Sequence, residues 1–288
     1  MYKAIGCIVI SALFFALMNM FVSLSGDIPT VQKTFFRNFF ALIIASGAMI
    51  RNRCSVIPPK GARLDLVLRA AFGFAGMLGN FYALSRLTVS DASMLNKMSP
   101  FFAIIFSAIV LKERADKVQW SIVAAAFAGA VLVIKPSFHN VELAASCAGF
   151  LGGMCAGVAY TFVRKITQKG IKGYYVVFFF SAFSTAAALP FVVFGYSPMS
   201  LEQWLYLIGA GICAAVGQFS ITAAYSFAPA REVSIYDYSQ IIFAALLGFF
   251  VMGQIPDWLS VAGYAVIIAA AFVMFKYNNR DISEKDSG

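Results

Sequence analysis

Apolar runs about twenty residues long follow one another along almost the whole chain. Each run can form a helix that crosses a bilayer, because a helix advances about 1.5 Å per residue through a hydrocarbon core about 30 Å thick. The runs cover residues 3–24, 31–50, 66–87, 91–111, 118–135, 146–167, 174–195, 203–227, 233–252 and 258–277. Barrel strands would be about half as long and would alternate apolar with polar residues. The sequence therefore predicts an all-α integral membrane protein with ten transmembrane helices.

The composition excludes an ordinary soluble domain. Hydrophobic residues make up 61% of the chain and charged residues 12%, against roughly half and a quarter in soluble domains. The connections between the runs are short, so they leave no room for a catalytic domain outside the membrane. The net charge of +9 does not indicate a nucleic-acid partner, because the basic residues lie in those connections, where they orient helices. We expect the lipid bilayer and a small-molecule substrate as partners of a monomer or homodimer.

The distribution of lysine and arginine predicts the orientation. If both termini are cytoplasmic, the cytoplasmic side receives Lys3, Arg51, Arg53, Lys60, Arg63, Arg69, Lys112, Arg114, Lys117, Arg164, Lys165, Lys169, Lys172, Arg231, Lys276, Arg280 and Lys285. The outer side receives only Lys33, Arg86 and Lys135. An excess of basic residues marks the cytoplasmic side, so we expect both the N and C termini there, in a multi-pass protein of the cell (plasma or inner) membrane.

The two halves of the chain are similar in sequence and form an internal repeat. A shift that places Asp116 on Asp257 aligns the two halves without a gap and places Lys135 on Lys276 and Gly76 on Gly217. Each copy holds five runs, an odd number, so the second copy enters the membrane from the opposite side. The sequence thus predicts two inverted-topology five-helix repeats, at 1–137 and 142–277, followed by a polar tail at 278–288.

Two stretches give the chain a likeness to a known family. The first half holds residues 90–102, SDASMLNKMSPFF, followed by Leu-Lys-Glu-Arg at 111–114, and the second holds Ala-Pro-Ala at 228–230 and the stretches 241–248 and 253–256. Together with the repeat, they resemble the EamA-type family of the drug/metabolite transporter superfamily. Gln254 stands where that family usually has a glutamate, and Ile241 stands in place of the proline of helix 4. The resemblance implies a membrane transporter and names no substrate.

Three ionisable residues, Arg37, Lys97 and Asp237, lie inside apolar runs. A charge at bilayer depth costs at least about 2.5 kcal/mol, so it usually faces a protected interior and has a function. Arg37 and Lys97 lie about 9 Å below the outer ends of their helices. Two cations there suit an anionic or zwitterionic substrate, such as an organic acid or amino acid. Asp237 can hold an ammonium group, pair with a cation or carry a coupling proton.

Uncharged polar residues extend the predicted substrate site. The candidates are Asn19, Asn80 and Asn96 in the first copy and Tyr160, Gln218 and Tyr238 in the second. Pro100 removes a helical hydrogen bond beside Lys97 and is the candidate hinge.

Other interpretations stay open for several of these residues. Arg37 lies near enough to a helix end to reach the membrane surface. Asp237 near a helix N-terminus is favoured by the helix dipole. Asn80 and Gln218 can simply join helices by hydrogen bonds. Glycines at 149, 153 and 157 predict close helix packing, with sliding during gating as the alternative.

The pattern favours a secondary transporter that works by alternating access. A channel or a non-transporting structural membrane protein is the alternative, and an intramembrane enzyme is less favoured because no hydrolase or metalloprotease motif is present. His139 is the only histidine and the cysteines show no paired spacing, so no metal site is expected. No phosphate-binding Gly-rich motif is present, so we expect no nucleotide cofactor.

The orientation can be tested by labelling. Single cysteines introduced as Arg53→Cys and Lys169→Cys, in a background with the native cysteines replaced, should both react with an impermeant maleimide only after the membrane is opened. Reaction of one from outside intact cells and of the other only from within would contradict the predicted arrangement.

Overall fold

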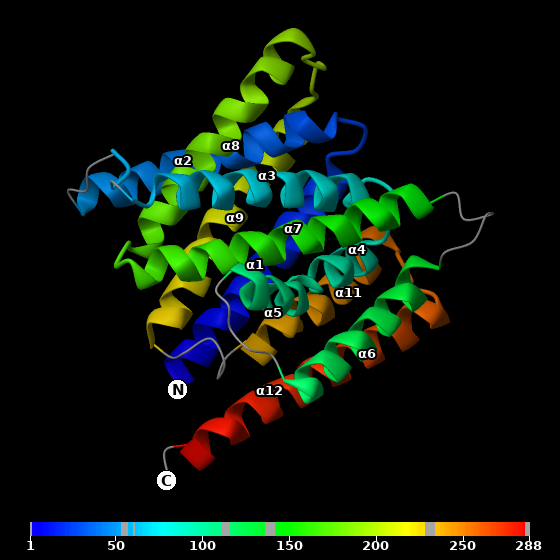
Figure 1. Ribbon diagram of the computed structural model, residues 1–288. Helices are drawn as coiled ribbons and strands as arrows, with labels where there is room; N and C mark the ends of the chain where they lie inside the picture. The colour runs from blue at the N-terminus through cyan, green and yellow to red at the C-terminus, as the bar shows by residue number, and fades with distance from the viewer. Residues whose placement is uncertain are drawn as a thin grey trace.

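A computed structural model describes residues 2–52, 57–59, 61–110, 116–135, 142–227 and 234–285, and within those ranges the chain is helical, with no strand (Figure 1). The helices are α1 (Tyr2–Leu24), α2 (Thr30–Arg51), α3 (Arg63–Leu84), α4 (Val89–Asn96), α5 (Ser99–Val110), α6 (Lys117–Ile134), α7 (Leu143–Gln168), α8 (Gly173–Phe194), α9 (Leu201–Phe227), η1 (Ser234–Tyr238), α11 (Ser239–Met252) and α12 (Trp258–Lys285).

Most of these helices can span a membrane. Within the described ranges, nine are long and apolar enough, if α4 and α5 are taken together as Val89–Val110. A shorter apolar helix runs over Tyr236–Met252. This short helix lies within the remaining predicted run, 233–252, and is shorter than the helices counted as spans.

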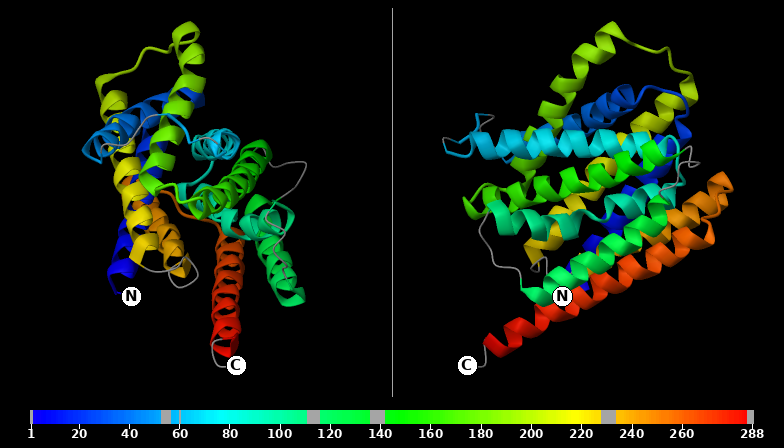
Figure 2. Two further views of the ribbon diagram at one scale, coloured as in Figure 1. Left: turned by 60° about the vertical axis from the view of Figure 1, so that its left-hand side comes forward. Right: turned by 45° about the vertical axis from the view of Figure 1, so that its right-hand side comes forward.

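The helices pack in pairs that join the two halves of the chain. α1 lies against α9, α3 against α7, α2 against α8, and α6 against α12. α5 also contacts α7, and α11 contacts α1. In both views of Figure 2 the α6–α12 pair lies along one side of the molecule. Every one of these pairs takes one helix from each half, so the two halves pack together as one unit.

The α6–α12 pair is fastened at both ends. Asp116 precedes α6 and accepts hydrogen bonds from the backbone N–H of Gln119, at 2.8 Å, and from the hydroxyl of Tyr277, at 2.7 Å. Asp257 precedes α12 and forms an ion pair with Lys135, at the opposite end of α6. An aspartate in this position satisfies backbone groups that the first helical turn leaves open. Here the same side chains also join the two helices.

Two of the predicted apolar runs, 91–111 and 233–252, are interrupted. α4 ends at Asn96 and α5 begins at Ser99, so the helix breaks directly before the expected hinge, Pro100. In the second half the 3₁₀ turn η1 changes into α11 between Tyr238 and Ser239. No proline lies near that second change, so the loss of a donor at proline cannot account for both interruptions.

Glycines let α7 approach the broken helix, as the sequence predicted. A Cβ atom added at Gly153 would lie 2.5 Å from the carbonyl oxygen of Leu95, and one at Gly157 would lie 2.5 Å from Cβ of Phe102. α3 reaches α7 in the same way, since a Cβ at Gly79 would lie 2.5 Å from the oxygen of Ala148. Side chains at these positions would push the helices apart.

This packing predicts opposite effects for two alanine substitutions. Gly157→Ala should lower the melting temperature of the purified protein in detergent, since overpacking typically costs about 1–3 kcal/mol. Gly47→Ala, whose added methyl group would meet no atom within 4 Å, should be neutral or stabilising by up to about 1 kcal/mol because alanine favours helix. Equal melting temperatures for the two variants would contradict the close approach at Gly157.

Candidate functional site

The two interrupted spans meet at an ion pair. Lys97, at the break between α4 and α5, pairs through Nζ with a carboxylate oxygen of Asp237 in η1. The exposed fractions of the two side chains are only 8% and 16%. Tyr238 adds a second link, because its hydroxyl donates to the carbonyl oxygen of Lys97 at 3.1 Å. At this junction the buried ammonium group of Lys97 has an acidic partner, and the backbone carbonyl of Lys97 has a hydrogen-bond donor.

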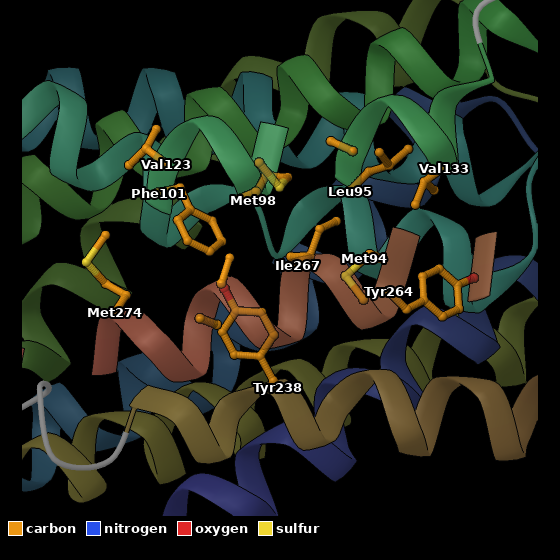
Figure 3. Packing of buried hydrophobic residues seen from close by; sticks show 14 of the residues in the cluster. Met94, Leu95, Met98, Phe101, Val123, Val133, Tyr238, Tyr264, Ile267 and Met274 are labelled. Atoms are coloured by element: carbon orange, nitrogen blue, oxygen red, sulfur yellow. The ribbon is translucent and has the colours of Figure 1, made fainter. Parts of the chain in front are cut away.

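Apolar side chains surround this junction. Figure 3 shows Tyr238 pointing from its own element toward Phe101 on α5 and Met98, which lies in the break between α4 and α5. All three belong to one buried cluster with residues of α6 and α12, such as Ile267. Charges in such surroundings are strongly penalised unless they are paired. Asp237 nevertheless keeps one carboxylate oxygen, Oδ1, without a hydrogen-bond partner among the described residues.

Arg37 is buried on α2 and held in position by its neighbours. Its Nη1 donates to the side-chain oxygen of Asn38 at 2.8 Å, and its Nε lies 3.5 Å from the sulfur of Met18. Asn38 is itself fixed, because its amide donates to the carbonyl oxygen of Thr34 at 2.8 Å. Since only 6% of Arg37 is exposed, the side chain does not extend to the surface.

Arg69 is a functional candidate that the sequence analysis missed. It was assigned to a cytoplasmic connection, but it lies inside α3 and is buried. Its guanidinium group lies 4.0 Å from the ring centre of Phe180 on α8. Its Nε and Nη1 have no hydrogen-bond partner within the described ranges. The sequence did contain a signal for it, because Arg69 is an ionisable residue inside the predicted apolar run 66–87.

Tyr160 lies on α7, and 47% of its surface is exposed. Of the predicted site residues, Lys97, Asp237 and Tyr238 form one cluster, through the ion pair and the hydrogen bond to the Lys97 carbonyl. Arg37 instead contacts Asn38 and Met18.

The predicted amides lie around this cluster and are less closely tied to it. Asn19 donates to the hydroxyl of Ser93 at 3.0 Å, and both are buried. Asn80 is buried on α3, and its side-chain oxygen has no partner in the described part of the chain. The backbone of Asn96 packs against Gly153. Gln218 is half-buried on α9.

A separate polar pocket of about 310 Å³ lies at the ends of α4, α6 and α7, away from the junction. Two of its acids are already partnered: Asp91 accepts from the hydroxyl of Tyr264 at 2.7 Å, and Asp257 pairs with Lys135. These contacts join helix ends.

The chain matches the family model described as "EamA-like transporter family" twice, over residues 2–135 and 143–276. It is 29% identical over 272 residues to the "Pseudopaline exporter CntI" of Pseudomonas aeruginosa, covering 92% of this chain and 93% of that protein. It is 26% identical over 283 residues to human "Solute carrier family 35 member G1", covering 91% of this chain and 75% of that protein.

A solved crystal structure, 18% identical in sequence, shares the fold, with a TM-score of 0.68 over 94% of this chain and 96% of its own. Two stretches that carried the resemblance, 111–114 and 228–230, lie outside the described residues. The family matches, the relatives and the apolar helices agree with one another. The chain belongs to the EamA-like transporter family and is a multi-pass membrane transporter of the drug/metabolite transporter type.

Proposed function

We propose that this protein is a secondary transporter that moves a small anionic or zwitterionic metabolite across the cell membrane by alternating access. In this proposal ten spans form two inverted repeats with both termini in the cytoplasm. The observation that carries the proposal is the meeting of two interrupted spans at the Lys97–Asp237 pair. Transporters with inverted repeats commonly bind substrate beside such discontinuous helices.

The internal symmetry supports inverted repeats. The shift that places Asp116 on Asp257 also places Lys97 on Tyr238, so the two interruptions fall at equivalent positions. The same shift maps α1 onto α7 and α3 onto α9. In the structure α1 packs against α9 and α7 packs against α3, so the two contacts are equivalent under the shift. A molecule with a pseudo-two-fold axis requires such reciprocal pairs.

Contacts between helix ends support the proposed orientation. Lys169 Nζ donates to the carbonyl oxygen of Gly61 at 2.7 Å, and both Lys165 and Lys169 pair with Asp65. The connections that follow α2 and α7 therefore lie at one end of the bundle. Their many basic residues favour the cytoplasmic side for that end.

The proposed mechanism uses the junction as the part that changes. A substrate anion would bind beside Arg37 and Tyr160, and a substrate ammonium group would compete with Lys97 for the Asp237 carboxylate. A coupling proton would have to compete for the same carboxylate. Separating the pair would free the ends of α5 and α11, which begin directly after it, to move relative to α7. Pro100 and the glycine contacts of α7 would permit that movement.

Counterflow in proteoliposomes tests the function. Vesicles containing the purified protein and a high internal concentration of an unlabelled metabolite should transiently accumulate the same labelled metabolite. Uptake should saturate, because a carrier completes one conformational cycle per substrate. Flux that rises without saturation and shows no counterflow would indicate a channel and overturn the proposal.

The Lys97–Asp237 pair predicts distinct effects on stability and transport. Lys97→Met alone leaves Asp237 buried and unpaired, so it should destabilise the protein by about 3–5 kcal/mol. The double variant Lys97→Met/Asp237→Asn removes both charges and should regain most of that stability, measured by thermal unfolding, while transport stays lost. Normal transport by the folded double variant would show that the pair has no part in the cycle.

A further inference from the structure

The two buried arginines, Arg37 and Arg69, lack the anion that buried cations require. Both are only 6% exposed. Arginine does not lose its proton in proteins, so both remain charged. The ion pairs within the described ranges use Asp65, Asp237 and Asp257 and leave both arginines without an acidic partner.

Both guanidinium groups are fixed by neighbouring side chains and keep unused hydrogen-bond donors. Arg69 lies between Phe180 and Gly73, where an added Cβ would meet both Nη1 of Arg69 and the phenylalanine ring at 2.9 Å. The aromatic face holds the cation and leaves Nε and Nη1 unpartnered. The contacts of Arg37 with Asn38 and Met18 leave its Nη2 without a described partner.

Depth separates the two cations along the membrane normal. α2 and α3 run in opposite directions in the proposed topology. Arg37 lies seven residues after the start of α2 and Arg69 six residues after the start of α3. Each is therefore about 10 Å inside an opposite end of a core about 30 Å thick. One compact anion would fit one arginine better than both.

We propose that the substrate carries two separated anionic groups, as a dicarboxylate does, with one bound by Arg37 and the other by Arg69. Lys97 takes no part in holding them, because Asp237 neutralises it in this conformation. Two negative charges balance the two cations, and each carboxylate can accept paired N–H groups from one guanidinium. This substrate class deepens the proposed transport function and rests on it.

Thermal stability of the purified protein tests the site with defined probes. Malonate, succinate, glutarate and adipate are compared with butyrate and inorganic phosphate at equal ionic strength. At least one dicarboxylate should raise the melting temperature by about 3 °C or more at saturation, with a clear optimum of chain length. Equal protection by butyrate or phosphate, or no protection by any dicarboxylate, would overturn the two-anion site.

Variants assign the effect to the arginines. Arg37→Gln and Arg69→Gln should each abolish the dicarboxylate shift, and Arg51→Gln, at the exposed end of α2, should retain it. Without ligand, Arg69→Gln should melt at the same temperature as the parent or higher, because it removes an unpaired buried charge. A lower melting temperature together with a retained shift would mean that Arg69 is purely structural.

A flux measurement separates this inference from the transport proposal. The dicarboxylate that stabilises the protein best is used, labelled, in counterflow. Binding without counterflow would refute transport of that class and leave the two-anion site intact. Counterflow of a neutral or cationic metabolite with no dicarboxylate protection would support a transporter and refute the site.

Discussion

The ion pair between Lys97 and Asp237 is the interaction on which the centre of this molecule depends. Both residues lie where a helix is interrupted, at a depth where lipid offers no hydrogen bonds. Each charge compensates the hydration that the other loses on burial. The hydroxyl of Tyr238 donates to the Lys97 carbonyl beside them. Without the pair, two interrupted spans would face one another with uncompensated charges. With it, the interruptions become a joint between the two halves.

Around that joint, some helix pairs are fixed more firmly than others. α6 and α12 are joined at both ends by contacts of Asp116 and Asp257. α7 and α3 are joined by ion pairs at one end, where Asp65 meets two lysines. Between α7 and α5 the contact is a smooth face of glycine against backbone and Phe102. Directional contacts resist displacement more than smooth ones do, so we expect movement to be easiest between α7 and α5.

Among the residues that the structure describes, nine of the ten predicted runs form helices long and apolar enough to span a membrane, because lipid imposes one simple rule, a long apolar helix, and that rule is local. The sequence also selected Lys97, Asp237 and Arg37, because charge within an apolar run can be read from single positions. It could not pair Lys97 with Asp237, since they are far apart in the chain and several partners were open to each. Arg69 was missed because its closeness to a basic connection suggested a role in orientation, whereas its burial depends on Phe180 in another helix.

The two halves share a fold, but they do not share their charges. The shift that superposes the repeats places Arg37 on Phe178 and Arg69 on Ala210. Both buried arginines therefore belong to the first half and have no charged counterpart in the second. Asp237 belongs to the second half, and Asn96 stands at its equivalent position. Equivalent interruptions and reciprocal helix pairs suit a site that opens alternately to either side. In the proposed transporter the unequal charges would give that site its chemical preference, and the shared fold would give it two-sided access.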